Sequence, residues 1–115
     1  MTVSVASSEE SNMAMPFEDG MAAYQRADYR TAMRLWRSLA DKGHATAQFY
    51  LASMFEYGHG VAQDYATAAG WYRKAADQGH ARAQCNLGLM YANGLGVAKD
   101  HATATTWLRK AADAV

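Results

Sequence analysis

The four histidines are the first side chains in this sequence that could do chemistry, because imidazole nitrogens bind zinc and related ions. His44 and His80 stand in equivalent Gly-His-Ala segments, while His59 and His101 are isolated in a turn and at a helix start. Helices that pack side by side are about 8–10 Å apart, whereas a zinc–nitrogen bond measures about 2.0–2.1 Å. No carboxylate or thiol completes a ligand set. We therefore expect no metal site and four ordinary surface histidines.

The thiol and the carboxylates do not predict a catalytic set either. Cys85 is the single cysteine, and a nucleophilic thiolate needs a histidine base beside it, whereas His80 lies off to one side of the same helix. We expect Cys85 to be partly buried and inert. Asp64 and Asp100 suit helix N-caps, which accept free backbone N–H groups, better than a pair of catalytic acids. The turn at residues 58–60 lacks the lysine of a phosphate-binding loop, so the sequence predicts no enzyme and no cofactor.

An internal repeat explains why these residues recur. Residues 43–78 and 79–114 are identical at 21 of 36 positions when they are aligned without a gap. At the same period Asp28 aligns with Asp64, which makes residues 17–42 an earlier, degenerate copy. A period of 20–50 residues is typical of units that stack, because one unit alone cannot bury its apolar face.

Each unit reads as two helices joined by a glycine turn. Within residues 44–56 apolar side chains recur at 3- and 4-residue spacing, and Gly58 and Gly60 end this helix because glycine accepts the left-handed backbone. The predicted fold is an all-α solenoid of about three helical hairpins, with repeat units 16–42, 43–78 and 79–115 and a disordered tail over residues 1–15. The predicted core consists of Leu35, Trp36, Leu39, Leu51, Phe55, Val61, Trp71, Leu87, Tyr91, Val97 and Trp107.

Composition narrows the classes of function. The chain has 115 residues, which suits one domain, and eleven basic residues balance eleven acidic ones. We expect no nucleic-acid partner, because a basic excess is absent. No run approaches the roughly 20 apolar residues of a membrane-spanning helix, and the N-terminal segment lacks the basic and apolar regions of a secretory signal. If Met1 is the native start, we expect a cytoplasmic protein in a reducing compartment, with no membrane partner.

Both complete copies follow one pattern: G-x-A-x-A-Q-x-x-L-(G/A)-x-x-(Y/F)-x-x-G-x-G-V-x-x-D-x-x-x-A-x-x-W-(Y/L)-x-K-A-A. This pattern resembles the Sel-one-like repeat (SLR), a branch of the tetratricopeptide-repeat superfamily, and the resemblance covers about residues 28–115. Residues 17–42 are closer to an ordinary tetratricopeptide unit, with A-Y-x-x-x-D-Y-x-x-A across Ala23 to Ala32.

The resemblance implies a right-handed α-solenoid whose first helices line a concave surface. It also implies an adaptor or scaffold, because members of the family commonly hold protein complexes together in signalling, cell-envelope regulation and host contact. The style of the repeats suggests a bacterial source. Secreted, cysteine-rich members carry one disulfide in each repeat, which a chain with one cysteine cannot form. Some of those members are linked to β-lactam binding, but Ser-x-x-Lys is absent from this sequence, so we do not extend that activity to it.

Positions that differ between the two copies are free to recognise a partner, since the shared positions already satisfy the fold. On the first helices they recur at 3- and 4-residue spacing, on the side away from Leu51 and Phe55. The divergent pairs are Thr46/Arg82, Phe49/Cys85, Tyr50/Asn86, Ser53/Leu89, Glu56/Ala92 and Tyr57/Asn93. We expect a peptide or helix of a protein partner to bind on the concave face through Thr46, Phe49, Tyr50, Ser53, Arg82, Asn86, Leu89 and Asn93. The alternative is that solvent-facing positions drift and that Phe49 packs on the preceding hairpin.

The last helix motivates a second hypothesis. Leu108, the counterpart of Tyr72, would lie on the face where another repeat would stack, and solenoids need polar caps. A second copy covering Leu108 would give a homodimer through uncapped repeat ends; otherwise Leu108 is merely tolerated exposure, or the natural chain is longer. A small-molecule-binding or enzymatic protein is the third hypothesis, and no residue pattern supports it.

Overall fold

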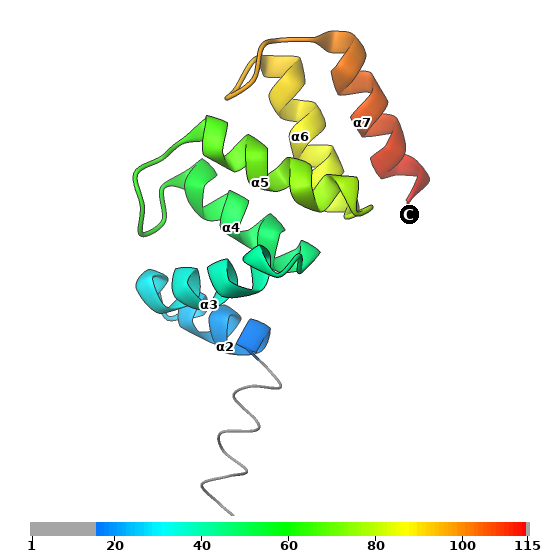
Figure 1. Cartoon of the computed structure of the whole chain (residues 1–115). Coiled ribbons are helices and arrows are strands. Elements are labelled where there is room, and N and C mark those ends of the chain that lie inside the picture. The colour runs from blue at the N-terminus through cyan, green and yellow to red at the C-terminus, as the bar shows by residue number, and fades with distance from the viewer. Residues whose placement is uncertain (1–15, 115) are drawn as a thin grey trace, which may run out of the picture.

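A computed structural model describes residues 16–114, and every regular element in this part of the chain is a helix. The helices are α2 (Pro16–Gln25), α3 (Tyr29–Asp41), α4 (Ala45–Tyr57), α5 (Tyr65–Asp77), α6 (Ala81–Asn93) and α7 (His101–Asp113). They pair as the hairpins α2/α3, α4/α5 and α6/α7, which follow one another along the stack in Figure 1. The predicted all-α solenoid is confirmed. The tail expected over residues 1–15 and Val115 lie outside the described residues.

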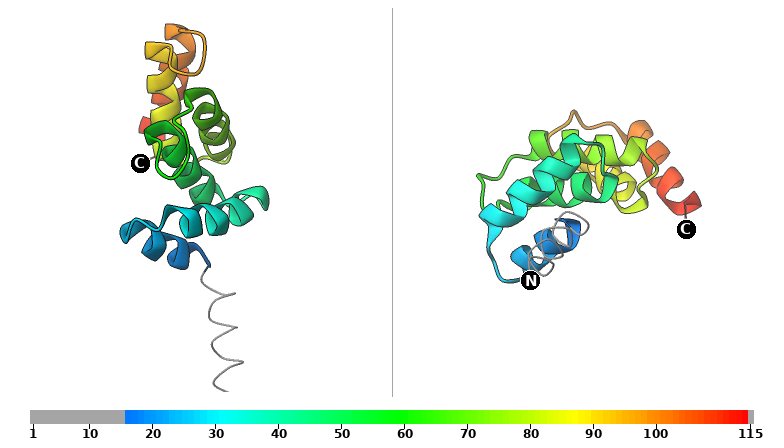
Figure 2. Two further views of the ribbon diagram at one scale, coloured as in Figure 1. Left: turned by 90° about the vertical axis from the view of Figure 1, so that its left-hand side faces the viewer. Right: turned by 60° about the horizontal axis from the view of Figure 1, so that its bottom comes forward.

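The hairpins form an elongated stack whose helices lie in two layers. Each helix packs on the next one along the chain, and the stack measures 61 × 30 × 20 Å. Figure 2 shows that the hairpins turn progressively from α2/α3 to α6/α7. Side chains of α4 meet α2 and α6, and those of α5 meet α3 and α7. The layer formed by α2, α4 and α6, the first helices of the hairpins, is called the first-helix face below.

Aspartates begin the second helix of each hairpin, as the sequence predicts for Asp64 and Asp100. Oδ1 of Asp64 accepts a hydrogen bond from the N–H of Thr67 at 3.1 Å, and Oδ1 of Asp100 accepts one from the N–H of Thr103 at 3.2 Å. Asp28 caps α3 in the same way. Hydrogen bonds from the threonines lower the pKa of all three aspartates, so the caps keep their charge at neutral pH.

The core runs through all three hairpins, and the sequence predicts most of it. Of the expected residues, the buried ones are Trp36, Leu51, Trp71, Leu87 and Trp107, and those half-buried against them are Leu39, Phe55, Tyr91 and Val97. Leu35 and Val61 are half-buried but lie outside this cluster, which corrects the prediction for both. The space inside is filled instead by Met54 and Tyr72, which are fully buried, and by alanines that let the helices approach closely.

The turn of each later hairpin rests on the hairpin before it. Gly60 (φ +78°) lies against Tyr29, and Gly96 (φ +72°) lies against the backbone of Tyr65. Both tyrosines begin a second helix. A Cβ added at Gly96 would collide with the carbonyl group of Tyr65, so this turn needs glycine for its backbone conformation and for its close approach.

Buried glutamines join consecutive hairpins through hydrogen bonds. Gln48 and Gln84 are 4% and 6% exposed, and their Nε2 groups donate to the carbonyl oxygens of Ala40 and Ala76, each at 3.1 Å. These carbonyls belong to the last turn of the preceding second helix, where intrahelical partners run out. Each carbonyl also accepts the backbone N–H of Gly43 or Gly79 at 3.0 Å, so each glutamine is a second donor that joins the helix end to the next hairpin.

The middle and last hairpins differ in how the glutamine oxygen is satisfied. Nε2 of Gln78 donates to Oε1 of Gln48 at 3.0 Å and to the carbonyl oxygen of Gly43 at 2.9 Å. Ala114 stands at the place of Gln78 one period later. Oε1 of Gln84 is buried and has no hydrogen-bond partner among the described residues.

Replacing Gly96 by alanine should lower the free energy of unfolding by more than the same change at Gly79. Gly79 has φ +90° with open space around its Cα, so Gly79→Ala carries only the cost of the left-handed conformation, about 1–2 kcal/mol. Gly96→Ala adds the collision with the Tyr65 backbone, roughly a further 1–3 kcal/mol. Urea unfolding followed by circular dichroism measures both variants, and equal losses would show that the turn does not press on α5.

Replacing Ala114 by glutamine should raise the free energy of unfolding by about 1 kcal/mol, because its N–H donor would satisfy the buried Oε1 of Gln84. Ala114→Glu is the matched control, since a glutamate has the same length and no donor at neutral pH. Thermal and urea unfolding of the two variants should differ in this direction. An equal effect of both substitutions would mean that helix extension, and not the hydrogen bond, sets the stability.

Candidate functional site

A hollow opens on the first-helix face between the carboxyl-terminal parts of α4 and α6. It has a volume of about 250 Å³, and we call it the α4/α6 groove. Its lining residues are Glu56 and Tyr57 of α4, Asn86, Leu89, Met90 and Asn93 of α6, and Leu95 of the following turn. Tyr57 is 61% exposed and Leu89 is 48% exposed, and they are the exposed large apolar side chains of the described residues. The face expected to be concave is thus hollowed where two apolar side chains meet water.

Glycine caps bring the ends of both helices to the groove. Gly58 (φ +71°) and Gly94 (φ +67°) adopt the left-handed conformation, and their N–H groups donate to the carbonyl oxygens of Met54 and Met90. The same turn chemistry recurs in both hairpins, so α4 and α6 end in the same way beside the groove. Helix carboxyl ends carry a partial negative charge, so this end of the groove favours a cationic group over an anionic one.

A hydrogen bond from α5 holds Glu56 at the groove. The hydroxyl of the fully buried Tyr72 donates to Oε1 of Glu56 at 2.6 Å. Burial first, and then the contact with Glu56, raises the pKa of Tyr72, so the phenol stays protonated and remains a donor. Counted from the helix ends, the positions equivalent to Glu56 are Tyr24 in α2 and Ala92 in α6. The carboxylate is therefore particular to the middle hairpin.

The groove gathers part of the predicted partner-binding set. Of that set, the lining residues are Asn86, Leu89 and Asn93. Glu56 and Tyr57 join them, and both belong to positions that differ between the two copies. Thr46 and Ser53 are half-buried on α4 and do not line the groove. A role for any of these residues in binding stays a prediction.

Two lining residues escape the comparison of the copies on the first helices. Met90 is identical to its counterpart Met54, so it gave no signal of divergence. Leu95 replaces His59 within the glycine turn, a divergence that lies beyond the helix ends.

Phe49 and Arg82 lie away from the groove, in a packed seam between the second and third hairpins, while the ring of Tyr50 stacks on Trp36 of the first hairpin with centroids 5.1 Å apart. Phe49 is 4% exposed, so the expectation that it faces a partner is wrong. Its ring stacks on His80 with centroids 4.8 Å apart, and the guanidinium of Arg82 lies 4.6 Å from its centre. Nη1 of Arg82 reaches the Tyr50 hydroxyl at 3.5 Å. Phe49 therefore packs on the following hairpin, because the side of α4 that carries it continues into the contact with α6.

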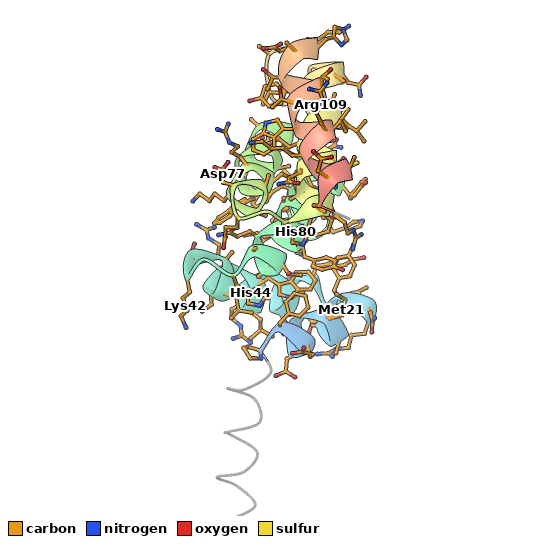
Figure 3. The ribbon with its side chains drawn as sticks, turned by 90° about the vertical axis from the view of Figure 1, so that its right-hand side faces the viewer. Met21, Lys42, His44, Asp77, His80 and Arg109 are labelled. Atoms are coloured by element: carbon orange, nitrogen blue, oxygen red, sulfur yellow. The ribbon has the colours of Figure 1, made fainter. Side chains whose placement is uncertain are left out.

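His44 and His80 cap the first helices of two hairpins. Nδ1 of His44 accepts a hydrogen bond from the N–H of Ala47 at 3.0 Å, and Nδ1 of His80 accepts one from the N–H of Ala83 at 3.2 Å. Figure 3 shows the two histidines on the same side of the stack, one hairpin apart. Burial first, and then the nearby charge of Arg82, lowers the pKa of His80. The expectation of an ordinary surface histidine is wrong for His80, which is half-buried. The Gly-His-Ala segment recurs in both copies, and this repetition is the feature of the sequence that indicates a structural role.

The remaining groups with reactive side chains are packed or dispersed. Nδ1 of His59 lies 2.7 Å from the Tyr24 hydroxyl, and its ring stacks on Tyr29 with centroids 5.1 Å apart, so His59 ties its turn to the first hairpin rather than standing free. Cys85 is half-buried, as expected. Within residues 16–114, no three histidine, cysteine, aspartate or glutamate side chains gather as metal ligands would. The same residues contain no helix with the length and apolar character that crossing a membrane requires.

Leu108 does not lie where the homodimer hypothesis needs it. It is half-buried, and its Cγ sits so close to Gly88 of α6 that a Cβ added there would be 2.8 Å away. The side chain is thus directed at its own hairpin. Residues exposed along α7 are His101, Ala102, Thr105, Thr106, Arg109, Lys110, Ala112 and Asp113.

The family model described as Sel1 repeat matches the chain three times, over residues 12–44, 45–80 and 81–114. The second and third matches begin two residues after the repeat units expected from the sequence, which start at 43 and 79. The exact boundaries of the units therefore stay a prediction. No curated protein matches the chain.

Solved structures share the stack. A Sel1 repeat protein from Oxalobacter formigenes is 38% identical with a TM-score of 0.72, and the match covers 74% of this chain and 65% of that one. A protective antigen of uropathogenic Escherichia coli with an SLR fold is 35% identical with a TM-score of 0.82, over 98% of this chain and 25% of that one. Helicobacter pylori cysteine rich protein B has a TM-score of 0.72 over 85% and 90% of the two chains, and at 18% identity it shares the fold alone. The chain therefore spans only part of the length of the first two.

Lowering the pH should destabilise the protein through His80. Because its folded-state pKa lies below the ordinary 6.5, the unfolded chain takes up the proton first as the pH falls. The stabilising neutral cap is fully present above about pH 6.5 and is lost as the pH falls through the folded-state pKa, a change of no more than about 1 kcal/mol.

The variant His80→Asn keeps a cap acceptor but does not titrate, so its free energy of unfolding should fall less between about pH 7.5 and about pH 5.5. Thr106→Asn, on the exposed side of α7, is the control and should keep the wild-type slope. Urea unfolding across this pH range gives the slopes. Identical slopes for wild type and His80→Asn would exclude the cap as the source of the pH dependence.

Proposed function

Because the chain belongs to the Sel1 repeat family, we propose that it is an interaction module that holds a peptide or a helix of a protein partner in the α4/α6 groove. Proteins built from these repeats generally serve as protein-interaction scaffolds, on a repeat fold that is not catalytic. The groove is the particular surface of this chain that we assign to that role.

The exposure of Tyr57 and Leu89 beside one hollow carries the proposal. Single apolar side chains on a surface are ordinary, but here an aromatic and an aliphatic side chain stand on neighbouring helices, and buried Met90 and half-buried Leu95 line the same hollow. A few well-packed anchors, tyrosine prominent among them, dominate the energetics of protein interfaces, and an aliphatic neighbour such as Leu89 adds apolar area. Nδ2 of Asn93 donates to the carbonyl oxygen of Leu89 at 2.9 Å, which leaves its Oδ1 and the amide of Asn86 to pair with the backbone of a bound segment.

The other hypotheses receive less support. A homodimer through the repeat end would need an apolar outer face on α7, whereas Leu108 is directed at α6 and the exposed residues include Thr105, Thr106 and Arg109. We propose no nucleic-acid partner, since the single charged lining residue, Glu56, is acidic. We propose no enzymatic activity, since the repeat fold of this family is a scaffold. The one half-buried thiol, Cys85, suits a reducing compartment, which supports a cytoplasmic location.

Selection of a phage-displayed library of random linear peptides against the protein tests the groove. Peptides selected by the wild type should bind Leu89→Asp at least about tenfold more weakly, because the substitution puts a charge on an apolar anchor. Thr106→Asp, an exposed position on α7, is the matched control and should bind them unchanged. Fluorescence anisotropy gives the affinities, and circular dichroism verifies that each variant folds. Peptides that bind both variants equally well would place the binding site elsewhere.

A further inference from the structure

The α4/α6 groove has an electrostatic polarity of its own. Glu56 is the only charged side chain among its seven lining residues. The carboxyl ends of α4 and α6 both border the groove, through Tyr57 and Asn93. Each end contributes about half a negative charge before screening. Lys99, in the turn after α6, is exposed and does not line the groove.

Arg82, a cation on the first-helix face, is positioned away from Glu56. Arg82 lies one helical turn before Asn86, and its guanidinium covers Phe49 and reaches the Tyr50 hydroxyl. It is thus engaged in the seam between hairpins, beyond the amino-terminal side of the groove. The end of the groove beside Glu56 and Tyr57 is therefore negative, with apolar side chains directly next to it.

Glu56 is also held in place before any ligand arrives. Oε1 accepts the hydrogen bond from the buried Tyr72 at 2.6 Å, which leaves Oε2 able to accept a hydrogen bond from a ligand. A fixed carboxylate loses less conformational entropy on pairing than a free one. The exposed ring of Tyr57 follows it in the chain and can receive a cation on its face.

From these observations we propose that the α4/α6 groove recognises a peptide segment in which a lysine or arginine stands next to an aliphatic side chain. The basic group pairs with Glu56 and lies against Tyr57, and the aliphatic group packs on Leu89, Met90 and Leu95. This inference rests on the proposed function, since it names the chemistry of the partner that the same groove would hold.

A structural role for Glu56 is the competing explanation, because the buried Tyr72 hydroxyl needs an acceptor. Glu56→Gln separates the two roles: the amide oxygen still accepts the tyrosine hydrogen bond, and only the charge is removed. Glu18→Gln, at an exposed position on α2, is the matched control for the loss of one negative charge from the whole molecule.

The test uses peptides selected from the phage library against the wild-type protein, resynthesised with a fluorescent label. We expect the selected sequences to share a lysine or arginine adjacent to leucine, isoleucine, valine or methionine. Glu56→Gln should weaken their binding about fivefold to tenfold. Added salt should weaken binding to the wild type and so reduce the difference in affinity between the two proteins. Glu18→Gln should leave the affinity unchanged, and replacing the basic residue of the peptide by glutamine should remove the difference between wild type and Glu56→Gln.

The outcomes separate this inference from the proposed function. Peptides that need Leu89 but carry no shared basic residue, or that bind Glu56→Gln as well as wild type, overturn the basic–aliphatic specificity and leave the groove as the binding site. A failure to select any peptide that depends on Leu89 overturns the proposed function and the specificity together. Selection of acidic peptides would reverse the assigned polarity.

Discussion

Packing of each hairpin on the one before it is the interaction on which the rest of this structure depends. A pair of antiparallel helices cannot cover its own apolar face, and Trp71 and Trp107 are buried where their hairpin meets the one before it. The same joint contains Gln48 and Gln84, whose amides reach the last turn of the helix before. Hydrophobic burial thus supplies the driving force, and the buried amides specify the register.

Charged side chains reinforce the joint from the outside. The guanidinium of Arg37 lies 5.3 Å from the ring centre of Trp71, and that of Arg73 lies 5.3 Å from Trp107. Each arginine comes from the hairpin that precedes its tryptophan, so every contact spans a boundary between units. Contacts of this kind contribute about 0.5–1 kcal/mol at exposed positions, which makes them secondary to the burial of the rings that they cover.

The joint between the second and third hairpins also determines where the surface is open. At its amino-terminal side, Phe49, His80 and Arg82 pack together and close the gap between α4 and α6. Toward the carboxyl ends the two helices carry Glu56, Tyr57 and Leu89, and the gap remains a groove. One seam therefore holds the groove walls at a set separation, so a ligand would meet a surface that is largely formed in advance.

The amino-acid sequence by itself determined the architecture of this protein. Its period of 36, the paired glycines of the turns and the aspartate caps at Asp64 and Asp100 are local signals, and each acts within one unit. Comparison of the two copies also found most of the groove, because lining positions such as Leu89 and Tyr57 differ between them.

Only the tertiary structure decided which divergent positions are open and which are packed. Phe49 and Leu89 belong to the same helical side and give the same signal in the sequence, yet Phe49 is sealed by His80 and Arg82 of the next hairpin. Likewise Leu108 turns toward the gap above Gly88 of its own hairpin. The physical reason is that burial here is set by contacts between units, and their geometry depends on the crossing of helices that are far apart along the chain.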